Sequence, residues 1–206
     1  QETGIIKIEE VGELEPIFEF KGEEYLPQTL TVLEDKFYFA TPYSNRVAGV
    51  VLGKEPVFTE MPDKIRSTTA LSGEDLLLLS QQGEVFILGR DKSSILLLSG
   101  EEVERYSSLS EFRSNLYFWD KEEREIIRFP YLGELSWGEP ELWLDKALSG
   151  EDSEVRSMSL DGGIWLLQNN KLLYFYKGGL EKTVEFTLYP EIREFDKIVT
   201  TENSAN

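Results

Sequence analysis

Four short segments decide the fold of this chain: Tyr106-Ser-Ser-Leu-Ser110, Leu116-Tyr-Phe-Trp-Asp120, Glu125-Ile-Ile-Arg-Phe129 and Pro140-Glu-Leu-Trp-Leu144. Most of them are rich in aromatic or branched apolar residues, and polar, Gly or Pro residues separate them, which is typical of short β-strands joined by turns. Helical periodicity is scarce here and elsewhere in the chain. The stretch therefore predicts four consecutive antiparallel strands.

The same order of four segments recurs on both sides of this stretch. The clearest copies are Ser67–Leu71, Leu76–Ser80, Glu84–Leu88 and Ser94–Leu98, then Ser157–Asp161, Ile164–Leu167, Lys171–Tyr176 and Thr183–Phe186, with a more divergent copy from Gln28 to Glu60. A recurring unit of about 40 residues with four strands is the signature of a propeller blade. We predict an all-β fold, a β-propeller of four-stranded antiparallel blades.

The two ends of the chain carry further pieces of the repeat. Gly4–Ile8 matches a third strand, Glu15–Phe20 a fourth strand and Lys197–Thr201 a first strand, whereas no second strand follows the last of these. Pairing both ends in one blade closes a ring and removes unpaired sheet edges. We predict one domain over residues 1–206 with five blades, at about 26–62, 65–100, 104–145, 155–189 and, for the closing blade, 1–22 plus 190–206. The alternative is a part of a larger propeller.

The repeat resembles NHL-like bacterial propeller repeats. The resemblance rests on a first strand rich in Ser and Thr, on the Leu116-Tyr-Phe-Trp-Asp120 type of second strand, and on Ser159-Leu-Asp-Gly-Gly-Ile-Trp-Leu166. The Gly-His and Trp-Asp marks of WD40 repeats are absent. The resemblance implies a binding or scaffolding platform, and its motifs place strands without supplying a catalytic residue.

Composition removes several classes of function. The chain of 206 residues has 21 Lys+Arg against 39 Asp+Glu, a net charge of -18, which repels nucleic acid and anionic membrane surfaces. It contains no Cys and no His, which excludes disulfides, the common zinc sites and the Ser-His-Asp and Cys-His nucleophile systems. The longest aliphatic runs fall far below the roughly 20 residues of a membrane span. We expect no cofactor and no membrane insertion.

Three arginines stand at the entry to consecutive first strands: Arg66, Arg105 and Arg156. In a chain of this charge they predict a cationic cluster at one mouth of the channel, able to hold a carboxylate, sulfate or phosphate. The alternative is that each pairs with a neighbouring acid such as Glu104 or Glu154 and links adjacent blades. The register is imperfect, because Arg66 lies five residues before Leu71 while the other two lie four residues before the matching Leu.

Aromatic residues give two further candidates for ligand contact. Tyr43 and Trp137 fall in predicted loops and suit a sugar ring or a protein partner. Trp119, Trp143 and Trp165 fall on predicted strands, where packing between blades is the simpler interpretation.

Carboxylates are candidates for metal binding and for glycoside hydrolysis. The acidic stretches at 101–104, 120–125 and 150–154 lack the alternating ligand spacing of a calcium loop, so we expect no metal site. Asp161, Asp196 and Glu34 are the acids nearest to first strands, but no motif distinguishes them from solvated turn residues.

The leading hypothesis is a non-enzymatic propeller that presents its loops and channel mouth to a protein, peptide or glycan. The alternative is a carbohydrate-binding or glycoside-hydrolase-like propeller that uses channel carboxylates, and a third is a structural or sensory segment of a larger envelope protein. Because the chain begins with Gln1, we expect a processed chain or a segment of a longer one, which with the family resemblance favours a location outside the cytoplasm.

Overall fold

The computed structural model describes residues 25, 27–71, 75–88, 95–98, 100–144, 148, 155–168 and 171–185. Nearly all regular structure within them is β-strand, arranged in four four-stranded antiparallel sheets. This confirms the all-β propeller fold. The closing blade predicted from residues 1–22 and 190–206 lies outside the described residues.

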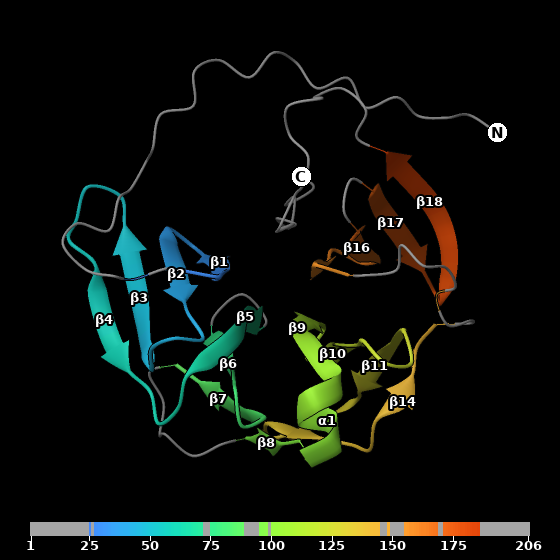
Figure 1. Cartoon of the computed structure of the whole chain (residues 1–206), viewed down its shortest axis with the longest axis horizontal. Coiled ribbons are helices and arrows are strands. Elements are labelled where there is room, and N and C mark those ends of the chain that lie inside the picture. Colours follow the sequence, from blue (N-terminus) through green and yellow to red (C-terminus); the bar gives the residue numbers. More distant parts are fainter. Residues whose placement is uncertain are drawn as a thin grey trace.

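Each sheet is one blade, and its strands follow in chain order from the inside of the arc to the outside (Figure 1). Blade I contains β1 (Thr29–Leu33), β2 (Lys36–Ala40), β3 (Arg46–Val51) and β4 (Val57–Glu60). Blade II contains β5 (Ile65–Leu71), β6 (Asp75–Ser80), β7 (Glu84–Ile87) and β8 (Leu96–Leu97).

The other two blades follow the same plan with one insertion. Blade III contains β9 (Tyr106–Phe112), β10 (Asn115–Asp120), β11 (Glu125–Phe129) and β14 (Glu141–Leu142), and the hairpin β12 (Tyr131–Gly133) and β13 (Ser136–Trp137) interrupts it before β14. Blade IV contains β15 (Ser157–Leu160), β16 (Ile164–Gln168), β17 (Lys171–Tyr176) and β18 (Gly179–Glu185). A short helix that the sequence did not predict, α1 (Gly100–Arg105), joins blade II to blade III.

Within the described residues the core consists of three apolar layers, one between each pair of neighbouring blades. Alternation along the strands supplies both faces of a blade, because successive side chains of a strand point to opposite sides. In β10, Leu116 and Phe118 pack toward blade II, while Tyr117 and Trp119 pack toward blade IV. Trp143 packs against the same layer as Trp119. Trp165 instead pairs with Tyr174, with ring centroids 4.6 Å apart.

Hydroxyl groups join the inner strands β1, β5, β9 and β15, which contact one another in that order. The hydroxyl oxygens of Thr31 and Thr68 lie 2.7 Å apart, and the Leu109 backbone N–H donates to Ser67 Oγ at 3.1 Å. The Ser110 hydroxyl donates to the Met158 carbonyl at 3.2 Å. The Ser and Thr residues of the first strands therefore link neighbouring blades by hydrogen bonds.

The connections divide the loops between two sides of the arc. Each inner strand begins beside the end of the second strand, as the bond from Lys121 N to Arg105 O at 3.1 Å shows for blade III. We call the side where the inner strands begin the entry face. The turns that join second to third strands lie on this face, and the turns that join first to second strands and third to fourth strands lie on the opposite face.

The first hairpin turn carries a strained residue, Glu34, whose φ is 55°. Glycine adopts this left-handed conformation without the steric cost that other residues incur. We expect Glu34→Gly to raise the free energy of unfolding by about 0.5–1 kcal/mol in chemical denaturation. Asp35→Gly is the matched control, because Asp35 is not among the residues with positive φ, and it is expected to lower stability. Equal effects of the two substitutions would contradict strain at Glu34.

Candidate functional site

The structure places all three arginines at the entry face. Arg66 lies in β5 where the pairing with β6 shifts between Ile65 and Ser67, Arg105 ends α1 directly before β9, and Arg156 directly precedes β15. The backbone explains the imperfect register seen in the sequence. Lys64, whose carbonyl accepts the Gln81 N–H at 2.8 Å, occupies in blade II the position that Arg105 occupies in blade III. Arg66 is therefore an extra cation, two residues further into its strand.

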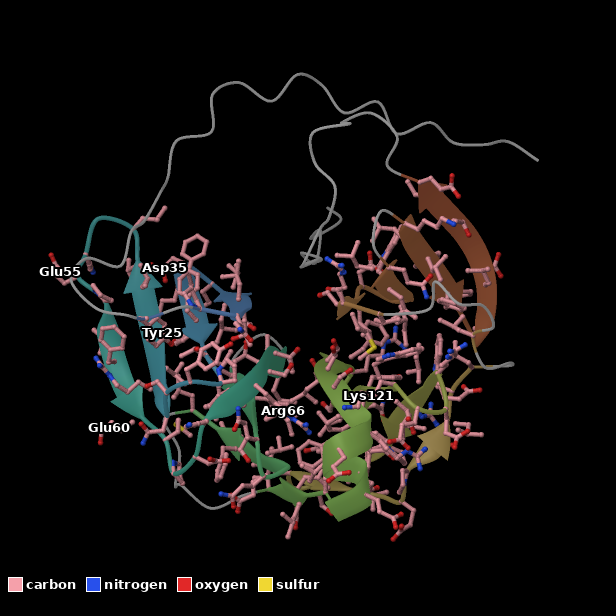
Figure 2. The ribbon with its side chains drawn as sticks, in the orientation of Figure 1. Tyr25, Asp35, Glu55, Glu60, Arg66 and Lys121 are labelled. Carbon is pink, nitrogen blue, oxygen red and sulfur yellow. The ribbon has the colours of Figure 1, made fainter. Side chains whose placement is uncertain are left out.

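Arg66 spans the junction between blade II and α1 (Figure 2). Its Nη1 donates to the carbonyl of Val103 at 2.6 Å, so the guanidinium caps the last turn of the helix. Its Nε and Nη2 atoms are buried and have no hydrogen-bond partner among the described residues. Burial lowers the pKa of Arg66. Such an unpaired buried donor is costly, which makes this group a candidate for an anionic partner.

Arg105 is paired within blade III. Its Nη2 bonds to the Asp120 carboxylate, and Glu122 and Glu123 follow at N–O distances of 3.8 Å and 4.0 Å. The hydrogen bond with Asp120 is the main reason that the pKa of Arg105 is raised. The partners differ from Glu104, the neighbouring acid considered from the sequence. Arg105 thus contributes a neutralised pair to the entry face, while its position is fixed beside the helix that Arg66 caps.

Asp120 has a second role at the end of β10. It is 0% exposed, and its Oδ1 accepts the backbone N–H groups of Glu122 at 3.0 Å and Glu123 at 3.1 Å. Ser80 holds the corresponding turn of blade II, where its Oγ accepts N–H groups at 3.1 Å from both Gln82 and Glu84. The last residue of the second strand is therefore a buried turn cap in both blades.

Glu125 is a second buried acid at the turn that follows Asp120. It is paired with Asp120 across the β10–β11 ladder and is 8% exposed. Its Oε2 is buried and has no hydrogen-bond partner in the part of the chain that the structure describes. Burial, and then the nearby charges of Asp120 and Glu123, raise the pKa of Glu125. Sequence reasoning identifies this stretch only as an acidic run. The signal that could have indicated the buried acids is an Asp and a Glu on the two sides of a tight turn between strands.

The two aromatic candidates lie on opposite faces. Tyr43 follows β2 on the entry face, is 67% exposed, and accepts a bond from Gln28 Nε2 at 3.3 Å. Trp137 lies on β13, on the opposite face, and its Nε1 donates to the Ser114 carbonyl at 2.7 Å. Its ring packs against the apolar layer between blades II and III. Trp137 thus holds the inserted hairpin against its blade and does not share a face with the arginines.

Among the described residues, the acids that are candidates for glycoside hydrolysis do not form a pair of facing carboxylates. Glu34 and Asp161 lie in turns on the opposite face, and Asp161 Oδ2 accepts the Trp165 Nε1–H at 3.1 Å. Asp196 lies outside the described residues. Within the described ranges, no group of three acids is arranged to hold a metal ion. In the same part of the chain, no helix is long and apolar enough to cross a membrane.

Comparison with known proteins supports the fold. No protein-family model matches the chain, and no curated protein resembles it in sequence. Solved propeller structures do match. A chain of a nidogen/laminin complex aligns with a TM-score of 0.62 at 10% identity, over 85% of this chain and 68% of that one.

Two bacterial proteins match as well. A catalytically inactive virginiamycin B lyase from Staphylococcus aureus, solved with quinupristin, gives a TM-score of 0.51 at 13% identity over 83% of this chain. PorZ, a surface component of the type-IX secretion system of Porphyromonas gingivalis, gives 0.52 at 14% identity over 86%. This chain spans only 59% of the lyase and 22% of PorZ. At these identities the likeness establishes the propeller fold, and the neighbours include enzymes and non-enzymes.

Proposed function

We propose that this chain is a non-enzymatic binding propeller whose entry face takes a protein or peptide that inserts a carboxylate beside Arg66. The observation that carries the proposal is the orientation of the Arg66 guanidinium. Nη1 is engaged with Val103, whereas Nε and Nη2, which form the side-on edge of the group, have no partner in the described part of the chain. This edge is the one that binds a carboxylate with two parallel hydrogen bonds, and because both atoms are buried, the carboxylate must insert beside α1 to reach them.

Net charge restricts the kind of partner. A chain with a net charge of -18 repels a strongly acidic ligand and attracts a basic one at long range. The partner is therefore a neutral or basic protein segment with a single acidic side chain or chain terminus. Tyr43, on the same face and largely exposed, offers an aromatic contact to such a segment.

The fold and its neighbours support a binding role in general terms. One neighbour is a chain from the nidogen/laminin complex, and another is the surface component PorZ. The resemblance to NHL-like repeats also implies a binding platform, and with PorZ it favours a location outside the cytoplasm. Arg156 belongs to this proposal as a further cation on the same face, whereas the charge of Arg105 is neutralised by Asp120.

The test is thermal unfolding of the full chain in sodium acetate and sodium sulfate against sodium chloride at equal ionic strength. A ligand of the native state raises the midpoint by mass action. Both salts stabilise folded proteins in general by exclusion from their surface. We expect an additional rise in acetate or sulfate that Arg66→Gln abolishes, because Gln carries neither the charge nor the side-on edge of the guanidinium. Arg128→Gln is the matched control, since Arg128 is paired with Glu141 at 2.7 Å. A rise in Arg66→Gln as large as in the parent chain would overturn the proposal, as would no rise in either salt.

A further inference from the structure

The outer end of the junction between blades II and III carries apolar side chains that the core leaves partly uncovered. Leu96 of β8 and, in the inserted hairpin, Leu135 and Trp137 pack against the layer between these blades but are only half-buried. Leu142 of β14 is 68% exposed. We call these four residues the II–III rim. Helix α1 borders it, because Val103 packs against the same layer.

The register of blade III directs Leu142 into this rim. Leu142 is paired with Ile127 across the β11–β14 ladder, and Ile127 belongs to the layer between blades II and III. Paired residues of an antiparallel ladder point to the same side of the sheet. Leu142 therefore extends this apolar layer outward, and Leu96 extends it from blade II. Both lie on strands at the outer side of the arc (Figure 1).

The segments that border the II–III rim are strongly acidic. Residues 100–105 form α1, and residues 130–144 contain the inserted hairpin and β14. Their acids, apart from Glu141, which pairs with Arg128, are Glu101, Glu102, Glu104, Glu134 and Glu139. The same residues include no lysine and a single arginine, Arg105, whose charge is neutralised by an acid of β10. The rim therefore combines apolar surface with excess negative charge.

We propose that the II–III rim binds a basic amphipathic segment of a partner protein. An apolar side chain of the segment packs on Leu96 and Leu142, and its lysines or arginines face the surrounding glutamates. Exposed apolar surface with a polar border is typical of interaction sites. Charge decides between the occupants, because a second copy of the chain would bring its own glutamates to this surface and an anionic membrane would be repelled. The proposal does not involve Arg66, so it stands or falls separately from the entry-face site.

Fluorescence anisotropy of a labelled lysine/leucine peptide, titrated with the full chain at physiological ionic strength, tests the proposal. The peptide has an amidated C-terminus, so it offers no carboxylate to Arg66. We expect saturable binding that weakens at least about 10-fold when serine replaces the leucines, because the apolar contact is lost. A glutamate/leucine peptide should not bind. The proposal is overturned if the lysine/leucine peptide does not bind, or if either of the other peptides binds equally well.

Leu142→Ser and Leu97→Ser form a matched pair of variants for the apolar contact. Leu97 is 67% exposed, nearly the same as Leu142, but strand alternation directs it to the side of β8 opposite to Leu96. Leu142→Ser should weaken binding of the lysine/leucine peptide about 10-fold, whereas Leu97→Ser should not. Equal effects would refute binding at the rim. Sedimentation without peptide should show a monomer, and a dimer that Leu142→Ser alone dissociates would assign the rim to a second copy instead.

A second pair of variants tests the charged border. Glu134→Gln combined with Glu139→Gln should weaken peptide binding about 5-fold, since both acids are exposed beside the rim. Glu55→Gln combined with Glu60→Gln removes the same charge from blade I, where both acids are also exposed (Figure 2), and should have no effect. Arg66→Gln should likewise leave peptide binding unchanged. Equal weakening by the two double variants would show that the net charge of the chain, and not the rim, attracts the peptide.

Discussion

Asp120→Ala is expected to lower the free energy of unfolding by about 2–4 kcal/mol, the cost of leaving several hydrogen-bond donors without the buried carboxylate that they share. The carboxylate is fully buried, bonds to Arg105 and accepts the N–H groups of Glu122 and Glu123. Without this carboxylate, the Arg105 guanidinium and the two backbone N–H groups lose the acceptor that they share. Urea denaturation followed by tryptophan fluorescence measures the change.

Glu141→Ala is the matched control for this prediction. Glu141 pairs with Arg128 at 2.7 Å, but about half of its side chain is exposed, and exposed pairs contribute about 0–1 kcal/mol. Adding Arg105→Met to Asp120→Ala should recover part of the lost stability, because the double variant no longer holds a guanidinium that has lost its hydrogen-bonded carboxylate. If Asp120→Ala costs no more than Glu141→Ala, the pair with Arg105 does not stabilise the blade.

Asp120 also shows how far the sequence can be interpreted. The segment Leu116–Asp120 was recognised as a second strand, and β10 has these residues after Asn115. The sequence did not reveal why the strand ends in Asp. The reason is the turn that follows, because Asp120 and Ser80 cap corresponding turns with different side chains. Because a hydroxyl caps the turn in one blade and a carboxylate caps it in the other, comparison of the repeats does not show that Ser80 and Asp120 share a role.

The Ser and Thr residues of the first strands are a second case in which the sequence shows the residues but not their role. They were used as a mark of the repeat, and the structure shows that Thr31, Ser67, Thr68 and Ser110 make bonds between blades. Such contacts join residues 37 to 48 positions apart, a separation that local patterns do not report. The propeller fold was therefore predictable from period and alternation, whereas its cross-links needed coordinates. The number of blades and the closing blade remain predictions.

The candidate site was predictable in part. The position of its three arginines before the first strands is predictable from the sequence. The sequence does not show that Arg105 is paired with an acid while Arg66 has buried nitrogens without a partner among the described residues. Helix α1 has six residues, too few to show a 3.6-residue period, so the carbonyl that Arg66 binds is not predictable from the sequence. Arg105 pairs with Asp120 on the neighbouring strand and not with the adjacent Glu104. Trp137 was assigned to a loop because β13 has only two residues.

Gly83→Ala is expected to lower the free energy of unfolding by about 2–4 kcal/mol, the sum of a strained backbone and an overpacked contact. Gly83 has a φ of 86°, which favours glycine. A methyl group there would overlap with Val103 Cγ2 and press on Leu98 Cβ at 3.2 Å. The turn of blade II therefore packs closely against α1, and thermal or urea unfolding measures the cost of separating them.

Gly53→Ala separates the two contributions. Gly53 has a φ of 77°, but a methyl group there would meet no atom within 4 Å, so only the backbone cost of about 1 kcal/mol should remain. Equal losses in both variants would show that the contact with Val103 does not constrain α1. The larger loss at Gly83 has a consequence for the entry face, because Val103 also supplies the carbonyl that holds Arg66. A displaced α1 releases that guanidinium, so Gly83→Ala should weaken the response to acetate or sulfate while Gly53→Ala leaves it unchanged.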